Sequence, residues 1–226
     1  MRISAIRREV FMRISGAIFD MDGTLVDSMP LWNNLVRDFL MDHGIEESEE
    51  LHRIMMTMTL DTSTQYIHDN LLPSLSVEEL KKQIEEKVWK AYSETIPIKH
   101  GVKPFLFALR NKGVRMCVAT SSPRILAEVI LKRLNLIHYF CFIFTCDELK
   151  TTKNLPDIYL RAHDILGTPK ETTYVFEDAV HAVKTAKSAG FKVVGIEDKS
   201  MVEYRDEIKE LCDIYVKDFD DFRGQI

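Results

Sequence analysis

The chain has 226 residues, 46% hydrophobic and 29% charged, and is therefore long enough to bury a substantial core in one domain or two unequal ones. Its net charge of -5 provides no general basic surface, which argues against nucleic-acid binding as the main task. No apolar run approaches the length of a membrane-spanning helix, so we expect no membrane partner.

Residues 1–13 are interpreted as an N-terminal extension and lead-in to the first domain. The segment is rich in arginine and has no sustained apolar stretch, so it lacks the pattern of a secretory signal. We assign it no function.

The first predicted strand, Ile14–Phe19, runs into two aspartates, Asp20 and Asp22, which are followed by Gly23. Residues i and i+2 of a strand point to the same face, so the two carboxylates can converge at its carboxyl end. Like charges so close together are costly unless a cation or a proton lies between them. An Asp-Gly turn after a strand explains the same residues without any chemistry, so the pair alone leaves both interpretations open.

The next segment, residues 30–99, is predicted to be a small helical domain inserted into the rest of the chain. Its four predicted helices are Leu31–Asp42, Glu47–Met55, Leu60–Leu71 and Val77–Thr95. The alternative is a helical elaboration packed directly on a sheet.

Strand and helix patterns alternate after the helical segment. The predicted strands are Val114–Thr120, Phe140–Thr145, Thr173–Phe176, Lys192–Ile196 and, more weakly, Asp213–Val216, and the predicted helices are Pro123–Leu134, Pro156–Leu166 and Ala179–Ala189. This alternation predicts an α/β fold with a Rossmann-like, mainly parallel sheet flanked by helices, formed by residues 14–29 and 100–226. Such sheets bind ligands at the carboxyl ends of their strands.

Three further features lie at predicted strand ends or helix starts. Thr120-Ser121 offers hydroxyl and amide donors before a helix that Ser122 is expected to cap, Lys153 precedes another helix, and Glu177-Asp178 follows a strand. Each has an ordinary explanation alone: helix capping, a solvated lysine, and acids that complement a helix dipole. Together with Asp20 and Asp22 they supply carboxylates for a cation, donors for an anion, and a lysine that offsets charge.

The four cysteines, Cys117, Cys141, Cys146 and Cys212, form no CxxC pair, and each lies in an apolar, strand-like run. We predict reduced, buried thiols in a cytoplasmic protein.

The order of these motifs resembles that of the haloacid-dehalogenase-like (HAD) hydrolase superfamily. The match is carried by Asp20-Met21-Asp22-Gly23-Thr24-Leu25-Val26-Asp27-Ser28 and extends from about Ile14 to Ile196. The chain looks closest to the subgroup with a helical cap after the first strand, which includes β-phosphoglucomutase-like enzymes and small phosphatases.

The resemblance implies a catalytic role for several residues. Asp20 would be the nucleophile that forms an aspartyl-phosphate, and Asp22 the general acid and then base. Thr120, Ser121 and Lys153 would hold the transferring phosphoryl group.

The resemblance also implies a Mg²⁺ cofactor. Its ligands would be Asp178, the Asp20 side chain and the Asp22 backbone carbonyl, with Glu177 assisting. Phosphoryl transfer depends mostly on positioning and charge neutralisation, which agrees with such a site.

Three residues depart from the family's pattern. Asn154 stands where a proline is usual, and Ala179 and Ala182 replace a serine and a glycine. Ala179 lacks a hydroxyl next to the metal ligands, which predicts weaker metal binding and leaves the chemistry intact.

Two absences favour hydrolysis over isomerisation. Mutases of this family usually carry a histidine where this chain has Trp32, and the expected glycine-containing specificity loop has no counterpart in Met55–Asp61. We therefore expect a phosphatase acting on a small phosphorylated metabolite, as a monomer or weak homodimer. A phosphomutase of the β-phosphoglucomutase type is the alternative, and a non-catalytic phospho-metabolite sensor is less favoured. A phosphonatase stays open, whereas Asp22 argues against a dehalogenase.

Overall fold

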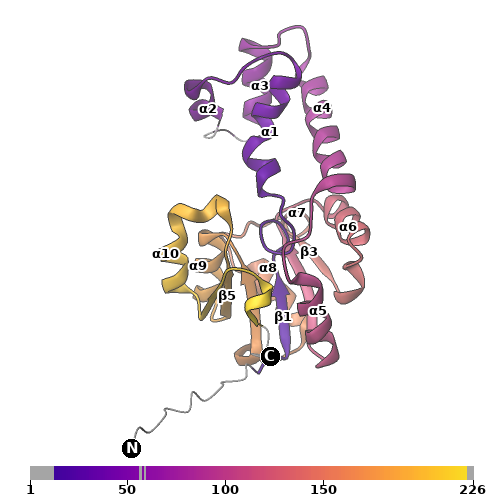
Figure 1. Cartoon of the computed structure of the whole chain (residues 1–226), viewed down its shortest axis with the longest axis vertical. Coiled ribbons are helices and arrows are strands. Elements are labelled where there is room, and N and C mark those ends of the chain that lie inside the picture. Colours follow the sequence, from indigo (N-terminus) through magenta and orange to yellow (C-terminus); the bar gives the residue numbers. More distant parts are fainter. Residues whose placement is uncertain (1–12, 56–57, 59, 223–226) are drawn as a thin grey trace, which may run out of the picture. The chain divides into compact units, whose positions relative to one another are not determined.

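The structure is a computed structural model of the chain that describes residues 13–55, 58 and 60–222. All but the last residue of the N-terminal extension expected at 1–13 therefore lie outside the described residues. The chain divides into two compact units (Figure 1). Among the described residues, one unit contains those up to Asp27 and from Pro97 onward, and the other lies within Ser28–Ile96.

The larger unit is built on a six-stranded sheet with the order β3-β2-β1-β4-β5-β6, in which every pairing is parallel. The strands are β1 (Gly16–Phe19), β2 (Arg115–Thr120), β3 (Ile143–Thr145), β4 (Thr173–Glu177), β5 (Lys192–Ile196) and β6 (Ile214–Val216). The α/β class with a parallel sheet, predicted from the alternating pattern, is confirmed. Central strand β1 is buried along its whole length, as both faces of a parallel sheet require.

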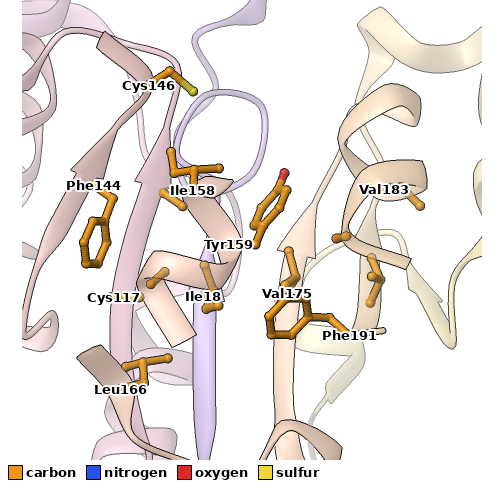
Figure 2. Packing of buried hydrophobic residues seen from close by; sticks show 14 of the residues in the cluster. Ile18, Cys117, Phe144, Cys146, Ile158, Tyr159, Leu166, Val175, Val183 and Phe191 are labelled. Carbon is orange, nitrogen blue, oxygen red and sulfur yellow. The ribbon is translucent and has the colours of Figure 1, made fainter. Parts of the chain in front are cut away.

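Helices cover the sheet on its two faces. They are α5 (Val102–Asn111), α6 (Arg124–Arg133), α7 (Cys146–Leu149), α8 (Asp157–Leu166), α9 (Val180–Ser188) and α10 (Arg205–Leu211). On one face, Ile18 and Val175 pack with Tyr159 and other residues of α8 and α9 (Figure 2). Helix α5 lies outside the predicted helices, although its buried residues Val102, Phe105, Leu106 and Leu109 follow a helical spacing.

The opposite face carries an aromatic cluster. The rings of Phe19 and Phe176, on neighbouring strands, stack with their centroids 4.4 Å apart. Phe105 of α5 and Phe219 of the 3₁₀ turn η5 (Phe219–Phe222) pack on them. Since successive strand residues point to opposite faces, Ile18 and Phe19 anchor β1 in both cores.

Two local predictions are wrong. Strand β3 begins at Ile143, because Phe140 closes a 3₁₀ turn, and this leaves Cys141 exposed although it was expected to be buried. Cys117 and Cys146 are buried, Cys212 is partly buried, and all four thiols are free. Ser122 does not cap α6; its hydroxyl bonds to Asp22.

The smaller unit is helical. Its elements are α1 (Met29–Asp42), α2 (Glu49–Met55), α3 (Leu60–Asn70), α4 (Val77–Lys90) and the π-helical turn η1 (Ala91–Thr95). Ser76 and Glu79 form a capping box that starts α4, with Leu80, Ile84 and Val88 on its buried stripe. The predicted helix Val77–Thr95 is therefore continuous, but its last turn changes its hydrogen-bond pattern. Across the described parts of both units, no helix combines the length and the apolar character needed to cross a membrane.

Candidate active site

The candidate site lies where the order of the strands reverses. From β1 the chain proceeds to β2 and β3 on one side, and then to β4, β5 and β6 on the other. The carboxyl ends of β1 and β4 are therefore neighbours at a topological switch point, which is where open α/β sheets bind their ligands. The Asp20 amide donates to the Phe176 carbonyl at 2.9 Å, which brings Asp20 beside Glu177.

A tight turn follows Asp20. The amides of Leu25 and Val26 both donate to the Met21 carbonyl, and the Gly23 amide donates to the Val26 carbonyl at 2.9 Å. Gly23 has φ of +84°, and a Cβ at this position would lie 2.3 Å from a carboxylate oxygen of Asp178. Only glycine satisfies both conditions, so the turn can press its backbone against an acid from the β4 end.

Three buried carboxylates meet at this point. Asp20, Glu177 and Asp178 each place an oxygen within 4.8 Å of the others. Thr24 donates its hydroxyl to Asp178 Oδ1 at 2.9 Å. Among the described residues, Asp20 Oδ2 and Glu177 Oε2 are buried with no hydrogen-bond partner. Buried acceptors of this kind are rare in proteins and call for an ion or water.

Lys153 joins two of these acids. Its ammonium bonds to Asp20 Oδ1 and, at 2.5 Å, to Glu177 Oε1, and only 5% of its side chain is exposed. The hydroxyl of Tyr159 donates to the same Glu177 oxygen at 2.8 Å. The lysine predicted as a phosphate-site residue is therefore in the acidic cluster, and Tyr159 is a further member that the sequence did not reveal.

The cluster shifts the pKa values of Asp20, Asp178 and Lys153. Burial raises the pKa of Asp20 well above its usual value; Lys153 opposes this effect, and Glu177 adds to it. Burial, reinforced by the charges of Glu177 and Asp198, raises the pKa of Asp178 to about 7. Burial alone would lower the pKa of Lys153, but the charges of Asp20 and Glu177 outweigh it and keep the ammonium protonated.

This donor set fits a divalent cation. Three carboxylates face one ammonium, which leaves an excess negative charge of two when all the acids are ionised. Hard oxygen donors, two of them otherwise unpaired, suit Mg²⁺. A bound cation would also offset the repulsion between carboxylates, which adds to burial in raising the pKa values of Asp20 and Asp178.

The pKa of Asp178 predicts a pH-dependent metal affinity. Below about pH 7 the carboxyl holds a proton that a bound Mg²⁺ would have to displace, so the affinity for Mg²⁺ should rise by about tenfold per pH unit up to pH 7 and level off above it. Calorimetry at pH 6 in two buffers of different ionisation enthalpy should show release of about one proton, and less at pH 8. Equal Mg²⁺ affinity at pH 6 and pH 8, with no proton release at pH 6, would contradict the assignment of Asp178 as a metal ligand.

Asp22 is bonded to another part of the site. Its Oδ2 accepts a hydrogen bond from Ser122 Oγ at 2.7 Å and one from Thr120 Oγ1 at 3.5 Å. Thr120 is buried and ends β2, whereas Ser121 is exposed with its hydroxyl 3.7 Å from Cys146 Sγ. The predicted residues other than Ser121 therefore form two adjoining groups, one around Lys153 and one around Asp22. Ser122 was expected only as a helix cap, so its contact with Asp22 was missed.

Comparison with known proteins agrees with this geometry. The family model described as haloacid dehalogenase-like hydrolase matches residues 17–196. A phosphorylated carbohydrates phosphatase of Thermotoga maritima is 33% identical over 179 residues, which cover 79% of this chain and 83% of the relative. A fructose-1-phosphate phosphatase of Escherichia coli is 27% identical, covering 83% of this chain and 98% of the relative. A solved Thermotoga maritima structure, provisionally assigned as a β-phosphoglucomutase, superposes with a TM-score of 0.77 at 30% identity, covering 92% of this chain and 96% of the other.

The chain belongs to the haloacid dehalogenase-like hydrolase family. Its relatives and structural neighbours place it among the β-phosphoglucomutase-like members of that family.

Proposed function

We propose that this protein is a Mg²⁺-dependent phosphatase that hydrolyses a small phosphomonoester, with phosphorylated carbohydrates as the substrate class. The observation that carries the proposal is the buried Asp20, whose Oδ2 has no partner among the described residues and whose Oδ1 is held by Lys153. The relatives named for phosphatase activity on phosphorylated carbohydrates and fructose 1-phosphate support the reaction and the substrate class. A cytoplasmic location, where the four free thiols stay reduced, belongs to the same proposal.

Asp20 acts as the nucleophile in the first half of the reaction. A carboxylate oxygen of Asp20 forms a bond to phosphorus while the bond from phosphorus to the ester oxygen breaks. The departing oxygen takes a proton from Asp22, whose carboxyl is oriented by the Ser122 hydroxyl. The products of this half are the free alcohol and an aspartyl-phosphate.

Asp22 serves as a base in the second half. It takes a proton from water, the water oxygen bonds to phosphorus, and the bond from phosphorus to Asp20 breaks. Inorganic phosphate leaves and Asp22 is protonated again. Lys153, with Thr120 and Ser121, neutralises and positions the phosphoryl oxygens.

Mg²⁺, held by Asp20, Asp178 and the Asp22 carbonyl with Glu177 assisting, would supply the positive charge that lets a carboxylate approach a phosphate dianion. Lys153 fixes the Asp20 side chain, and Tyr159 fixes Glu177. The departures at Ala179 and Ala182 leave all these groups in place. Ala179 precedes α9 without a capping side chain.

The structure gives no support to the mutase alternative. Trp32 stands where the family's mutases usually have a histidine, and its Nε1 donates to the Tyr92 hydroxyl at 2.9 Å. An indole nitrogen is a donor only, so Trp32 cannot accept a proton as a general base. In the glycine-free stretch Met55–Asp61, residues 56, 57 and 59 lie outside the described residues.

A substrate screen tests the proposal. The purified chain, with and without Mg²⁺, is incubated with p-nitrophenyl phosphate and a panel of sugar and polyol phosphates, and released phosphate is measured. Mg²⁺-dependent release supports the proposal, and release at the buffer rate from every ester overturns it. Conversion of β-glucose 1-phosphate to glucose 6-phosphate with a bisphosphate activator would establish the mutase instead.

Replacing Lys153 by methionine should slow turnover by about 10²- to 10³-fold, since the variant loses the ammonium that contacts Asp20. Methionine keeps most of the buried volume, and the carboxylates that bind Mg²⁺ remain. Steady-state kinetics should therefore show a fall in kcat, while calorimetry shows Mg²⁺ binding preserved. A folded Lys153→Met variant with wild-type kcat would place the lysine outside the reaction.

A further inference from the structure

We propose that Lys99 is a positioning residue of the active site, which ties the turn that carries Asp22 and Gly23 to the loop after β5. The proposal rests on the proposed function for its effect on turnover, and on the structure alone for its effect on the turn.

Lys99 makes three polar contacts with two separate segments. Its ammonium donates to the Gly23 carbonyl at 2.6 Å, to the Glu197 carbonyl at 2.9 Å and to Asp198 Oδ2 at 2.8 Å. These three acceptors use all three donors of a lysine. Gly23 directly follows Asp22, and Glu197 and Asp198 follow the end of β5. One side chain therefore joins the first catalytic motif to a segment far along the chain.

The contact is largely shielded from solvent. The Lys99 and Asp198 side chains are 13% and 4% exposed. Asp198 Oδ1 is bonded to the amide and hydroxyl of Ser200, so the aspartate is fixed from its other side. Bonds from Lys99 and Ser200 hold the pKa of Asp198 below its usual value although burial acts to raise it. An ion pair that is largely shielded from water is screened much less than a pair on the surface.

The backbone around Lys99 pairs with the same turn. The Lys99 amide donates to the Leu25 carbonyl at 3.0 Å, and the Asp27 amide donates to the Pro97 carbonyl at 2.9 Å. Val26 and Ile98 form an antiparallel bridge. The segments around Val26 and Ile98, where the chain leaves and re-enters the larger unit, thus run side by side. The Lys99 side chain links these two segments to the loop at the carboxyl end of β5.

The consequence for catalysis concerns Asp22. Its carboxyl must reach the leaving oxygen, and its main-chain carbonyl must face the cation, so both depend on the path of the Asp22–Gly23 turn. Loss of Lys99 would remove the bond to the Gly23 carbonyl and with it the connection from the turn to the loop after β5, while the side-chain bonds of Asp22 and Thr24 remain. A displacement of about 1 Å in a catalytic group can cost on the order of 10²-fold in rate.

Hydrogen–deuterium exchange of Lys99→Met tests the inference without reference to turnover. Exchange in residues 22–27 should be about tenfold faster than in the wild type, because the turn opens more often. Lys187→Met is the matched control, because it also removes a lysine–aspartate pair, here with Asp213. This pair lies near the amino ends of β5 and β6, whereas the active-site turn lies at the carboxyl ends of the strands. The control should leave exchange in residues 22–27 unchanged.

Kinetics supply the second readout. In Lys99→Met, kcat should fall by roughly 10- to 100-fold with KM changed by less than about threefold, because substrate contacts remain. Lys187→Met should retain wild-type kinetics. Asp198→Asn keeps the bonds from Lys99 to the Gly23 and Glu197 carbonyls, so it should also show faster exchange and a lower kcat, both to a smaller extent. If Lys99→Met does not fold, Asp198→Asn takes its place in both measurements.

Wild-type exchange in residues 22–27 of a folded Lys99→Met, or of Asp198→Asn where Lys99→Met is unfolded, would overturn the inference. Faster exchange with unchanged kcat would overturn the catalytic part of it. If the wild type releases phosphate from no ester, the proposed function fails, and the exchange data alone still decide whether Lys99 holds the turn.

Discussion

Asp20→Asn is expected to abolish turnover, with kcat lowered by about 10⁴-fold or more, because an amide oxygen cannot form the acyl-phosphate bond. The substitution preserves shape, and the new amide keeps an oxygen that can accept a hydrogen bond from Lys153, so the fold should persist. Single-turnover phosphate release with p-nitrophenyl phosphate measures the loss. Circular dichroism and thermal unfolding check the fold.

A matched control uses an acid outside the site. Asp164 lies exposed on α8, and Asp164→Asn should keep wild-type turnover. With radiolabelled substrate, acid-quenched wild-type protein should carry covalent phosphate and Asp20→Asn should carry none. Normal turnover by a folded Asp20→Asn would refute the assignment of the nucleophile.

Asp178→Asn is expected to stabilise the metal-free protein and to abolish its response to Mg²⁺. The folded state holds a proton on Asp178 up to about pH 7, whereas an unfolded aspartate loses it near 3.8. The free energy of unfolding therefore falls as pH rises between these values, and at pH 8 the wild type carries the full cost of a buried charge. Asparagine removes a cost on the order of 2–4 kcal/mol.

Thermal unfolding at pH 6 and pH 8 measures both effects. At pH 8, Asp178→Asn without metal should unfold at a higher temperature than the wild type, and the difference should shrink at pH 6. Millimolar Mg²⁺ should raise the wild-type Tm and leave the variant unchanged. Asp206→Asn, at an exposed position on α10, serves as control and should respond as the wild type does. Equal stabilisation of Asp178→Asn by Mg²⁺ would place the cation elsewhere.

Local pattern predicted the sheet well because its strands are short, apolar and separated by helices. Strand β5 has the predicted bounds, Lys192–Ile196, and the acids expected at strand ends lie there. The prediction required only that parallel strands share one carboxyl edge. Helix α5 was missed even though its spacing was readable.

The contacts within the site could not be predicted in this way. Lys153 and Asp20 are 133 residues apart, and Ser122 and Asp22 are 100 apart. Such pairs depend on how α6 and α8 pack on the sheet, and the periodicity of apolar residues within one segment does not predict that packing. Tyr159 reads as one more apolar position of an amphipathic helix, so its bond to Glu177 emerges only in three dimensions.

The position of β1 in the sheet bears on how the protein is made. Its two neighbours are β2, which begins at Arg115, and β4, which begins at Thr173. During synthesis from the N-terminus, β1 is therefore made before both of its neighbours, and the nascent chain exposes an apolar edge of this strand until β4 emerges. The acidic cluster forms equally late, because Asp20 is made long before Glu177 and Asp178, and a chain that ends before β4 lacks two of its three acids.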